Sequence, residues 1–258
     1  MIKDALTHAA NFANEADKTS AGHSFVVISD RTFAVSNGTS GAIVCGAPDG
    51  ITATVALKQL RKTIAKSGDS PALSVGKGKL MVKAGRSKVS LPMTSRPGAI
   101  ETDWPDSSAK RQPLPANVVS AIQSAATIQK TEGSALDGIR LAPEIVAVCT
   151  QTSIVAVQTD AFDWADPATI HPKVFARGLS GDYSVFKSGR RLWFEAPGDH
   201  AVWTLPLAGA YPDTLVRSKL LTEFDTEGSI TFAVDVDEIL ASIAKASVLL
   251  DGDESAVI

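Results

Sequence analysis

The chain has 258 residues, of which 44% are hydrophobic and 21% charged, with a formal net charge of −3 and two cysteines. These values are ordinary for a globular protein, so they exclude disordered, collagen-like and coiled-coil chains, and the length favours two domains. The acidic balance argues against a protein that coats nucleic acid with its whole surface. Because no apolar run reaches the ~18 residues of a membrane span and the N-terminus does not resemble a signal peptide, we expect a cytoplasmic protein without membrane contact.

The first hundred residues are predicted to alternate two helices with short antiparallel strands. Residues 2–17 form the first predicted helix, because Ile2, Leu6 and Ala9 share one helical face. Leu57, Leu60 and Ile64 have helical spacing within a second helix over 56–66. Strands are expected where apolar runs alternate with turn signals, over residues 24–29, 32–36, 42–45, 72–75, 79–84 and 87–91.

A linker is expected over residues 94–113, which are rich in Pro, Ser and charge. Helices are then predicted over 115–128 and 171–176, and a last strand and helix over 229–234 and 235–250. Further strands are expected over residues 138–142, 145–150, 153–158, 183–187, 191–195 and 201–205.

The two halves of the sequence resemble each other. Residues 73–92 and 183–206 both read as three strands ending in Leu-Pro, and an aromatic-Pro-Asp follows each, at 104–106 and at 211–213. The alternative is a chance similarity of short hairpins, but order and spacing agree throughout. The repeat predicts an α+β protein whose domains each pack two helices on antiparallel sheets. The predicted boundaries are 1–110 and 111–220 for two domains and 221–258 for a partial third domain or appendage.

Three segments resemble motifs of the bacterial sliding clamp family, the beta subunit of DNA polymerase III. They are KLMVKAGRSKVSLP at 79–92, AVQTDAFDWA at 156–165 and WTLPLAGAYPD at 203–213. The resemblance implies a homo-oligomeric ring around double-stranded DNA, with helices lining the hole, that acts as a replication processivity factor. It further implies a protein that is not an enzyme, needs no cofactor, and has a DNA polymerase and an ATP-driven clamp loader as partners.

The sequence departs from the family pattern in three ways. No strand precedes Ile2, the third domain stops after one helix, and residues 161–164 differ from the family's motif. These departures suit a divergent phage-type or shortened clamp, and they leave a trimer or a dimer open. They also favour an alternative function, a clamp-derived scaffold or modulator of a host clamp that no longer encircles DNA.

The pore of such a ring needs diffuse positive charge that faces the phosphates of DNA, without contacts to the base edges. The helix over 56–66 has four basic residues and no acidic one, although a solvated helical face is the plain alternative. The expected pore residues are Lys18, Lys58, Arg61, Lys62, Lys66, Lys130, His171, Lys173 and Arg177.

A separate pocket for a short peptide motif of polymerase or loader is implied by the resemblance. Its residues are Leu136, Thr159, Ala161, Phe162, Asp163 and Trp164, of which Leu136 and Trp164 suit core packing equally well. An unrelated α+β enzyme finds no support, because the four histidines have no metal-ligand spacing and no catalytic constellation is recognisable. We therefore expect no metal site and no catalytic residue.

Overall fold

The structure is a computed structural model. It describes residues 2–13, 23–67, 71–98, 100–105, 109–128, 138–143, 145–149, 154–159, 167–170, 183–196, 198–207 and 211. The chain divides into two compact units, 1–212 and 213–258, and all the described residues lie in the first. The elements predicted over 171–176, 229–234 and 235–250 lie outside the described residues.

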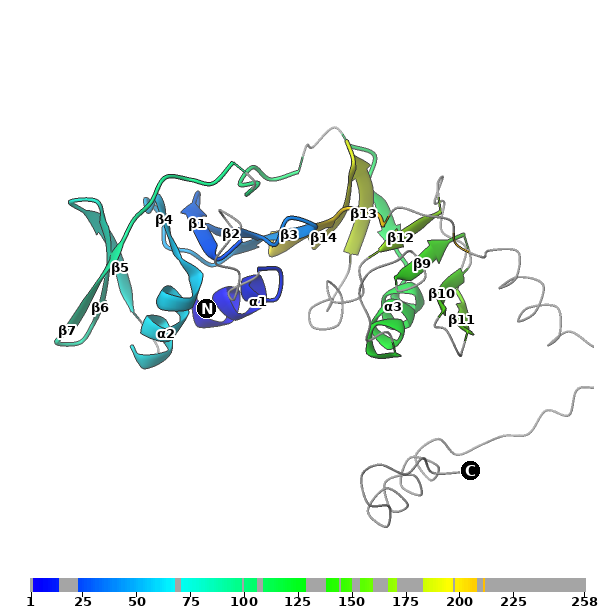
Figure 1. The fold of residues 1–258 in the computed structure, drawn as a ribbon, viewed down its shortest axis with the longest axis horizontal. Helices are drawn as coiled ribbons and strands as arrows, with labels where there is room; N and C mark the ends of the chain where they lie inside the picture. The colour runs from blue at the N-terminus through cyan, green and yellow to red at the C-terminus, as the bar shows by residue number, and fades with distance from the viewer. Residues whose placement is uncertain are drawn as a thin grey trace, which may run out of the picture. The chain divides into compact units, whose positions relative to one another are not determined.

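Among the described residues, the first half of the larger unit has two helices and seven strands (Figure 1). The helices are α1 (Ile2–Ala10) and α2 (Leu57–Lys66). The strands are β1 (Phe25–Ser29), β2 (Thr32–Ser36), β3 (Ser40–Cys45), β4 (Ala53–Ala56), β5 (Ala72–Gly76), β6 (Lys79–Ala84) and β7 (Ser87–Pro92).

The second half repeats this pattern of helix and strands. Its described helix is α3 (Ala116–Ile128). Its strands are β8 (Gln112–Leu114), β9 (Ile139–Ala142), β10 (Ile145–Cys149), β11 (Ile154–Gln158), β12 (Ala168–Ile170), β13 (Tyr183–Ser188), β14 (Arg191–Ala196) and β15 (His200–Thr204).

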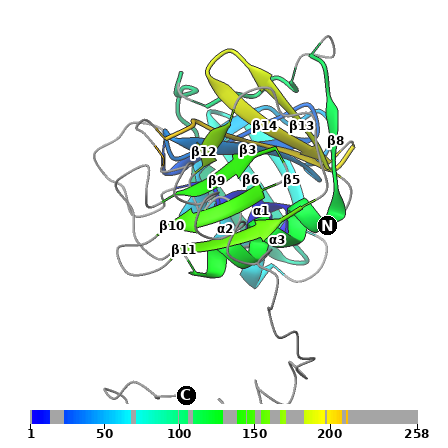
Figure 2. The same cartoon turned by 90° about the vertical axis from the view of Figure 1, so that its right-hand side faces the viewer.

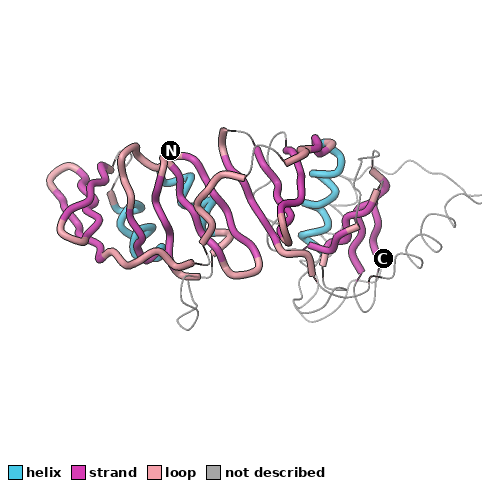
Figure 3. The backbone as a smooth tube through the Cα atoms, turned by 90° about the horizontal axis from the view of Figure 1, so that it is seen from above, coloured by secondary structure: helices cyan, strands magenta, loops and turns pink. Residues whose placement is uncertain are grey.

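One antiparallel sheet crosses from the first half to the second (Figures 1 and 3). Its strand order is β4-β1-β2-β3-β15-β14-β13-β8, and β3 pairs with β15 at the crossing. We call the β3–β15 pairing the joint. A four-stranded sheet, β11-β10-β9-β12, and a three-stranded sheet, β5-β6-β7, complete the described strands.

The two halves have the same strand topology. The order β4-β1-β2-β3 in the first half corresponds to β12-β9-β10-β11 in the second, and β5-β6-β7 corresponds to β13-β14-β15. The correspondence leaves one difference: β8 pairs with the outer edge of β13, whereas no described strand pairs with the outer edge of β5. The internal repeat inferred from the sequence is therefore present in the fold.

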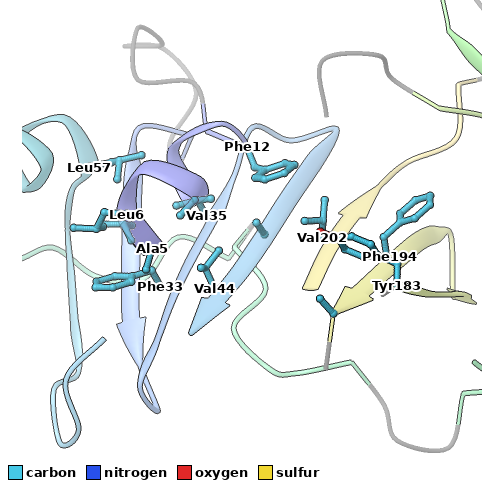
Figure 4. Packing of buried hydrophobic residues seen from close by; sticks show 14 of the residues in the cluster. Ala5, Leu6, Phe12, Phe33, Val35, Val44, Leu57, Tyr183, Phe194 and Val202 are labelled. Carbon is cyan, nitrogen blue, oxygen red and sulfur yellow. The ribbon is translucent and has the colours of Figure 1, made fainter. Parts of the chain in front are cut away.

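The joint is buried on both faces. On one face, α1 packs with β2 and β3, and the apolar cluster continues through Val44 of β3 to Val202 of β15 and Phe194 of β14 (Figure 4). On the other face, Ile43 packs in a second cluster with Trp203. Adjacent residues of one strand thus point into different clusters, as the pleat of a strand requires.

The predicted linker covers the face of the large sheet that lies opposite the helices (Figure 1). Ile100 is buried there, and Trp104 packs against the same cluster. The indole Nε1 of Trp104 and the guanidinium of Arg111 both donate to the buried carboxylate of Glu195. Because a buried carboxylate is stable only with such partners, these contacts fasten the linker to the second half of the sheet.

Most predicted elements are confirmed within one or two residues, with two kinds of exception. Three short strands were missed, β4, β8 and β12. The first helix is shorter than predicted, because α1 ends at Ala10 and turn residues follow. Short strands of three or four residues give too little periodicity to be recognised and depend on their pairing partners.

Candidate nucleic-acid interface

Helix α2 presents the clearest charged surface of the described residues. Its apolar residues Leu57, Leu60 and Ile64 are buried, and its first amide donates to the carbonyl of Ser24. At its end the amide of Ser67 donates to the carbonyl of Ile64, which closes the last turn. The helix is therefore held by one apolar face and leaves the other face to solvent.

The exposed face of α2 carries three lysines at intervals of four residues. Lys58, Lys62 and Lys66 are exposed, and about 6 Å of helix rise separates each from the next. Within the described part of the chain these three ammonium groups form no ion pair, and α2 contains no acidic residue. Arg61 lies beside them and is partly buried. The result is a positive stripe, which we call the α2 lysine stripe.

Helix α1 extends this positive surface. It packs next to α2, and both helices lie on the same side of the large sheet (Figures 1 and 2). Lys3 joins Lys58, Arg61 and Lys62 around a surface hollow of about 390 Å³ between the two helices. Lys3 was not predicted, because the neighbouring Asp4 hides its charge in the sequence.

A second hollow of about 660 Å³ lies between the end of α2 and the β6–β7 hairpin. Lys62 and Lys66 form one wall, and the turn at Gly85 and Ser87 forms part of the other. Four of the nine expected pore residues thus come together on one helix. The other five, Lys18, Lys130, His171, Lys173 and Arg177, lie outside the described residues.

Each of the three sheets has two outer strands whose outer edge pairs with no described strand, and the outer edges of β7 and β11 are two of these six. By the repeat, β7 corresponds to β15 and β11 corresponds to β3, which are the two strands that form the joint. An unpaired edge presents free backbone amides and carbonyls that can pair with another strand. Each half therefore has one strand that corresponds to a strand of the joint but whose outer edge is unpaired: β7 in the first half and β11 in the second.

Strand pairing fixes which residues of the two halves correspond. The closing pairs of the two matching hairpins, Gly76–Lys79 and Ser188–Arg191, place Val89 of β7 at the position of Val202. The same reasoning applied to β1–β3 and β9–β11 places Val155 and Val157 at the positions of Ala42 and Val44.

The exposed valines coincide with these edges. Val89, Val155 and Val157 are 41%, 38% and 38% exposed, whereas their counterparts in the joint are buried. The fourth large apolar side chain that is exposed in the described residues is Val75, on the uncovered strand β5. Exposed apolar side chains beside unpaired backbone indicate a surface that another strand covers.

Comparison with solved structures identifies the fold. The Helicobacter pylori beta clamp bound to a DNA ligase peptide matches with a TM-score of 0.70 at 17% identity, over 96% of this chain and 74% of that one. The Caulobacter crescentus pol III beta matches with a TM-score of 0.71 at 16% identity, over 96% and 73%. The DNA polymerase sliding clamp of Bacillus subtilis matches with 0.69 at 14%, over 98% and 73%. The chain has the bacterial sliding-clamp fold. No protein-family model and no curated protein sequence matched it.

The sliding-clamp fold confirms the predicted α+β class. Among the described residues no group of three or more His, Cys, Asp or Glu side chains could hold a metal ion. In the same part of the chain, no helix has the length and apolar character needed to cross a membrane.

Of the predicted peptide pocket, the structure places Thr159 alone, directly after β11. Its side chain is buried, and its hydroxyl has no hydrogen-bond partner among the described atoms. Leu136 and residues 161–164 lie outside the described residues. On the same sheet the guanidinium of Arg140 lies 5.4 Å from the ring centre of Tyr211 and donates to Thr169. Arg140 was not predicted as a site residue, because an arginine within a strand can have many roles.

Proposed function

We propose that this protein is a DNA sliding clamp, a ring of identical chains that encloses double-stranded DNA and tethers a DNA polymerase. The observation that carries the proposal is that β7 and β11, which correspond to the paired strands β15 and β3 of the joint, both have an unpaired outer edge. A chain that displays both halves of one complementary contact at different places can assemble head to tail, and such contacts close into a ring when the rotation allows.

The joint supplies the geometry of this assembly. We propose that β11 of one copy pairs with β7 of the next in the register that β3 and β15 use within the chain. In that register Val89 lies opposite Val155, where Val202 lies opposite Ala42 in the joint. Three copies then provide six similar domains, which corresponds to the trimer that the sequence left open.

The α2 lysine stripe supplies the charge that faces DNA. Its position on the helix-bearing side of the sheet supports the expectation that helices line the hole. Lysine side chains hold phosphates as flexible point charges and read no base edges, which suits a protein that slides. We include Lys3 among the pore residues, beside Lys58, Arg61, Lys62 and Lys66, and we retain Lys18, Lys130, His171, Lys173 and Arg177 in the proposal.

The domain division remains part of the proposal, with clamp domains at 1–110 and 111–220 and a partial third domain or appendage at 221–258. We retain a divergent phage-type or shortened clamp in the proposal, and the low identity to the neighbours supports a divergent one. A clamp of this kind works on DNA in the cytoplasm.

A peptide pocket at the second domain is the proposed route to polymerase and clamp loader. The H. pylori clamp structure holds a DNA ligase peptide, which supports short peptides as ligands of this fold. In this chain we assign Leu136, Thr159 and residues 161–164 to the pocket. Of these residues the structure describes Thr159, whose buried hydroxyl has no hydrogen-bond partner among the described atoms.

Retention on DNA tests the proposal. A clamp loader of the host is used to place the protein on nicked circular DNA, and retention is compared before and after the circle is cut. A clamp stays on the circle and slides off the cut ends, whereas a protein that binds one DNA surface is lost equally from both. Combined replacement of Lys58, Arg61 and Lys62 by Glu should abolish retention without unfolding the chain.

A control reverses two charges elsewhere in the same half. Lys77→Glu with Lys79→Glu changes two exposed lysines at the β5–β6 turn, away from α2, and should leave retention intact. If both variants lost retention on circular DNA equally, the effect would be due to net charge. Full retention of the α2 variant would contradict the assignment of these residues to the pore.

The second candidate function is a clamp-derived scaffold or modulator of a host clamp that does not encircle DNA. The uncovered outer edge of β5 favours it, because a partner strand can add there in place of the strand that β8 supplies in the second half. A monomer that binds a host clamp and is not retained on circular DNA would select this alternative.

A further inference from the structure

A cluster of histidine and tyrosine side chains lies where the two halves meet, and the proposed function does not use it. His200 is the first residue of β15, and its ring is buried. Its Nε2 lies 2.6 Å from the hydroxyl of Tyr183 on β13, and its Nδ1 lies 2.9 Å from a carboxylate oxygen of Asp199. His8, in the last turn of α1, completes the cluster: the centres of the two imidazole rings lie 4.5 Å apart.

Both nitrogens of the His200 ring have hydrogen-bond partners. An ionised carboxylate only accepts hydrogen bonds, so Nδ1 donates to Asp199, and Nε2 is bonded to the hydroxyl of Tyr183. His8 differs, because its Nε2 is buried without a hydrogen-bond partner among the described atoms.

A proton on His8 therefore has no acceptor in this arrangement. The groups that face His8 are the ring of Phe12 on its own segment, His200 on β15 and, beyond His200, Asp199 on the β14–β15 turn and Tyr183 on β13. Only Asp199 carries negative charge, and its side chain is 74% exposed and already accepts from His200. A cation at His8, a half-buried side chain, would lie against a second imidazole with its Nε2 shut off from solvent.

We propose that the His8–His200 pair makes the contact of α1 with the second half acid-sensitive, so that protonation of His8 drives the last turn of α1 away from His200 on β15. The proposal concerns the joint within one chain and does not depend on ring formation or on DNA binding. Its consequence is a fold whose two halves loosen from each other in mild acid while the core of each half stays folded.

The direction of the pH dependence follows from the two states of His8. Burial, with a smaller contribution from His200, lowers the pKa of His8 in the folded chain to about 4. In the unfolded chain the pKa is near 6.5, so the unfolded state binds more protons between these values. The contribution of His8 to stability is complete above about pH 6.5 and declines as the pH falls toward 4.

Urea denaturation of the whole chain at about pH 7.5 and about pH 5 tests the proposal. The wild type should unfold at lower urea at the lower pH. His8→Phe, which keeps an aromatic ring against Phe12 and carries no charge, should lose more than about half of that shift. His23→Gln removes another histidine of the first half, whose ring lies near Gly38, and should keep the wild-type shift.

A second measurement covers the case in which His8→Phe does not fold. Hydrogen exchange of the wild type should show that the protection factors of α1 amides fall between these pH values more than those of α3. Equal pH dependence in wild type and His8→Phe would overturn the proposal. So would α1 protection that changes no more than that of α3.

Discussion

The joint and the open edges are made of corresponding strands, but their side chains differ in size. In the joint, Trp203 of β15 lies opposite Gly41 of β3, and the indole occupies the space that a Cβ on Gly41 would need. At the open edges the corresponding residues are Ser90 of β7 and Ile154 of β11. The indole of Trp203 packed over Gly41 suits a permanent contact within the chain. The smaller side chains at the open edges suit the proposed contact between copies, which would have to open and close.

The linker adds to this difference. It covers Trp203 and the stacked rings of Phe186 and Trp193, whose centres lie 6.3 Å apart. The guanidinium of Arg191 lies 4.4 Å above the ring of Trp203 and pairs with Glu101 of the linker at 2.8 Å. The described residues show no such cover at β7 or β11. The joint thus has a second layer. In the proposed ring the contact between copies must open to admit DNA, and the absence of such a layer at β7 and β11 fits that requirement.

The largest expected effect is the loss of Trp203. Trp203→Ala should destabilise the chain by about 3–5 kcal/mol, because a buried indole at the joint leaves a cavity in both halves. Ser90→Ala at the corresponding open-edge position should change stability by less than about 0.5 kcal/mol, since the side chain is exposed. Urea denaturation measures both, and similar effects in the two variants would remove the distinction between joint and edge.

The next effect is at Gly41, from the other side of the same contact. A Cβ there would lie 2.6 Å from the indole of Trp203 and equally close to the carbonyl oxygen of Val35. Gly41→Ala should therefore cost about 1–3 kcal/mol. Gly76→Ala is the control, because a Cβ at Gly76 meets no atom within 4 Å. If Gly41→Ala were as stable as the wild type, the close packing of β3 against Trp203 of β15 would not contribute to stability.

Loss of the linker's anchor should have a smaller effect. Glu195→Gln keeps the shape of the side chain but removes the charge that Arg111 pairs with, so we expect about 1–3 kcal/mol of destabilisation. Proteolysis of the linker should become faster in the variant. Unchanged proteolysis and unchanged stability would show that apolar packing alone holds the linker on the sheet.

The smallest effect is expected at a single lysine of α2. Lys58→Ala should leave the urea midpoint unchanged, because the side chain is exposed and unpaired in the described structure. If Lys58 neutralises one phosphate, the salt dependence of DNA binding should fall by about 0.9 in log–log slope. If the salt dependence of DNA binding were the same as in the wild type, Lys58 would not contact a phosphate.

The repeat and most strands could be predicted from the sequence because turn signals such as Asn37-Gly38 separate consecutive strands. The side chain of Asn37 accepts hydrogen bonds from the amides of Thr39 and Ser40, and Gly38 adopts a φ of 90°, so the signal has a local physical cause. Strand β8 was missed because Pro113 lies at its centre, and proline is tolerated there since β8 is an edge strand.

The site was predictable to a different degree. The lysines of α2 were recognisable because an acid-free basic helix is unusual in an acidic chain. Lys3 and the open edges were not recognisable, since Lys3 joins α2 only through the packing of α1. Strand edges are open or closed according to pairing between segments far apart in the chain, as with β3 and β15, and no local pattern encodes that.

Absolute mass in solution tests the central claim, that β11 of one copy pairs with β7 of the next. At micromolar concentration and moderate salt, light scattering should give three times the chain mass of 26.9 kDa for the wild type. Val155→Glu should give the mass of a single chain with an unchanged urea midpoint, because the substitution places a charge at the contact and leaves the core intact. Val75→Glu, an equally exposed valine outside that contact, should keep the assembly. A wild type that stays at the single-chain mass, or an assembly that Val155→Glu leaves whole, would contradict the account.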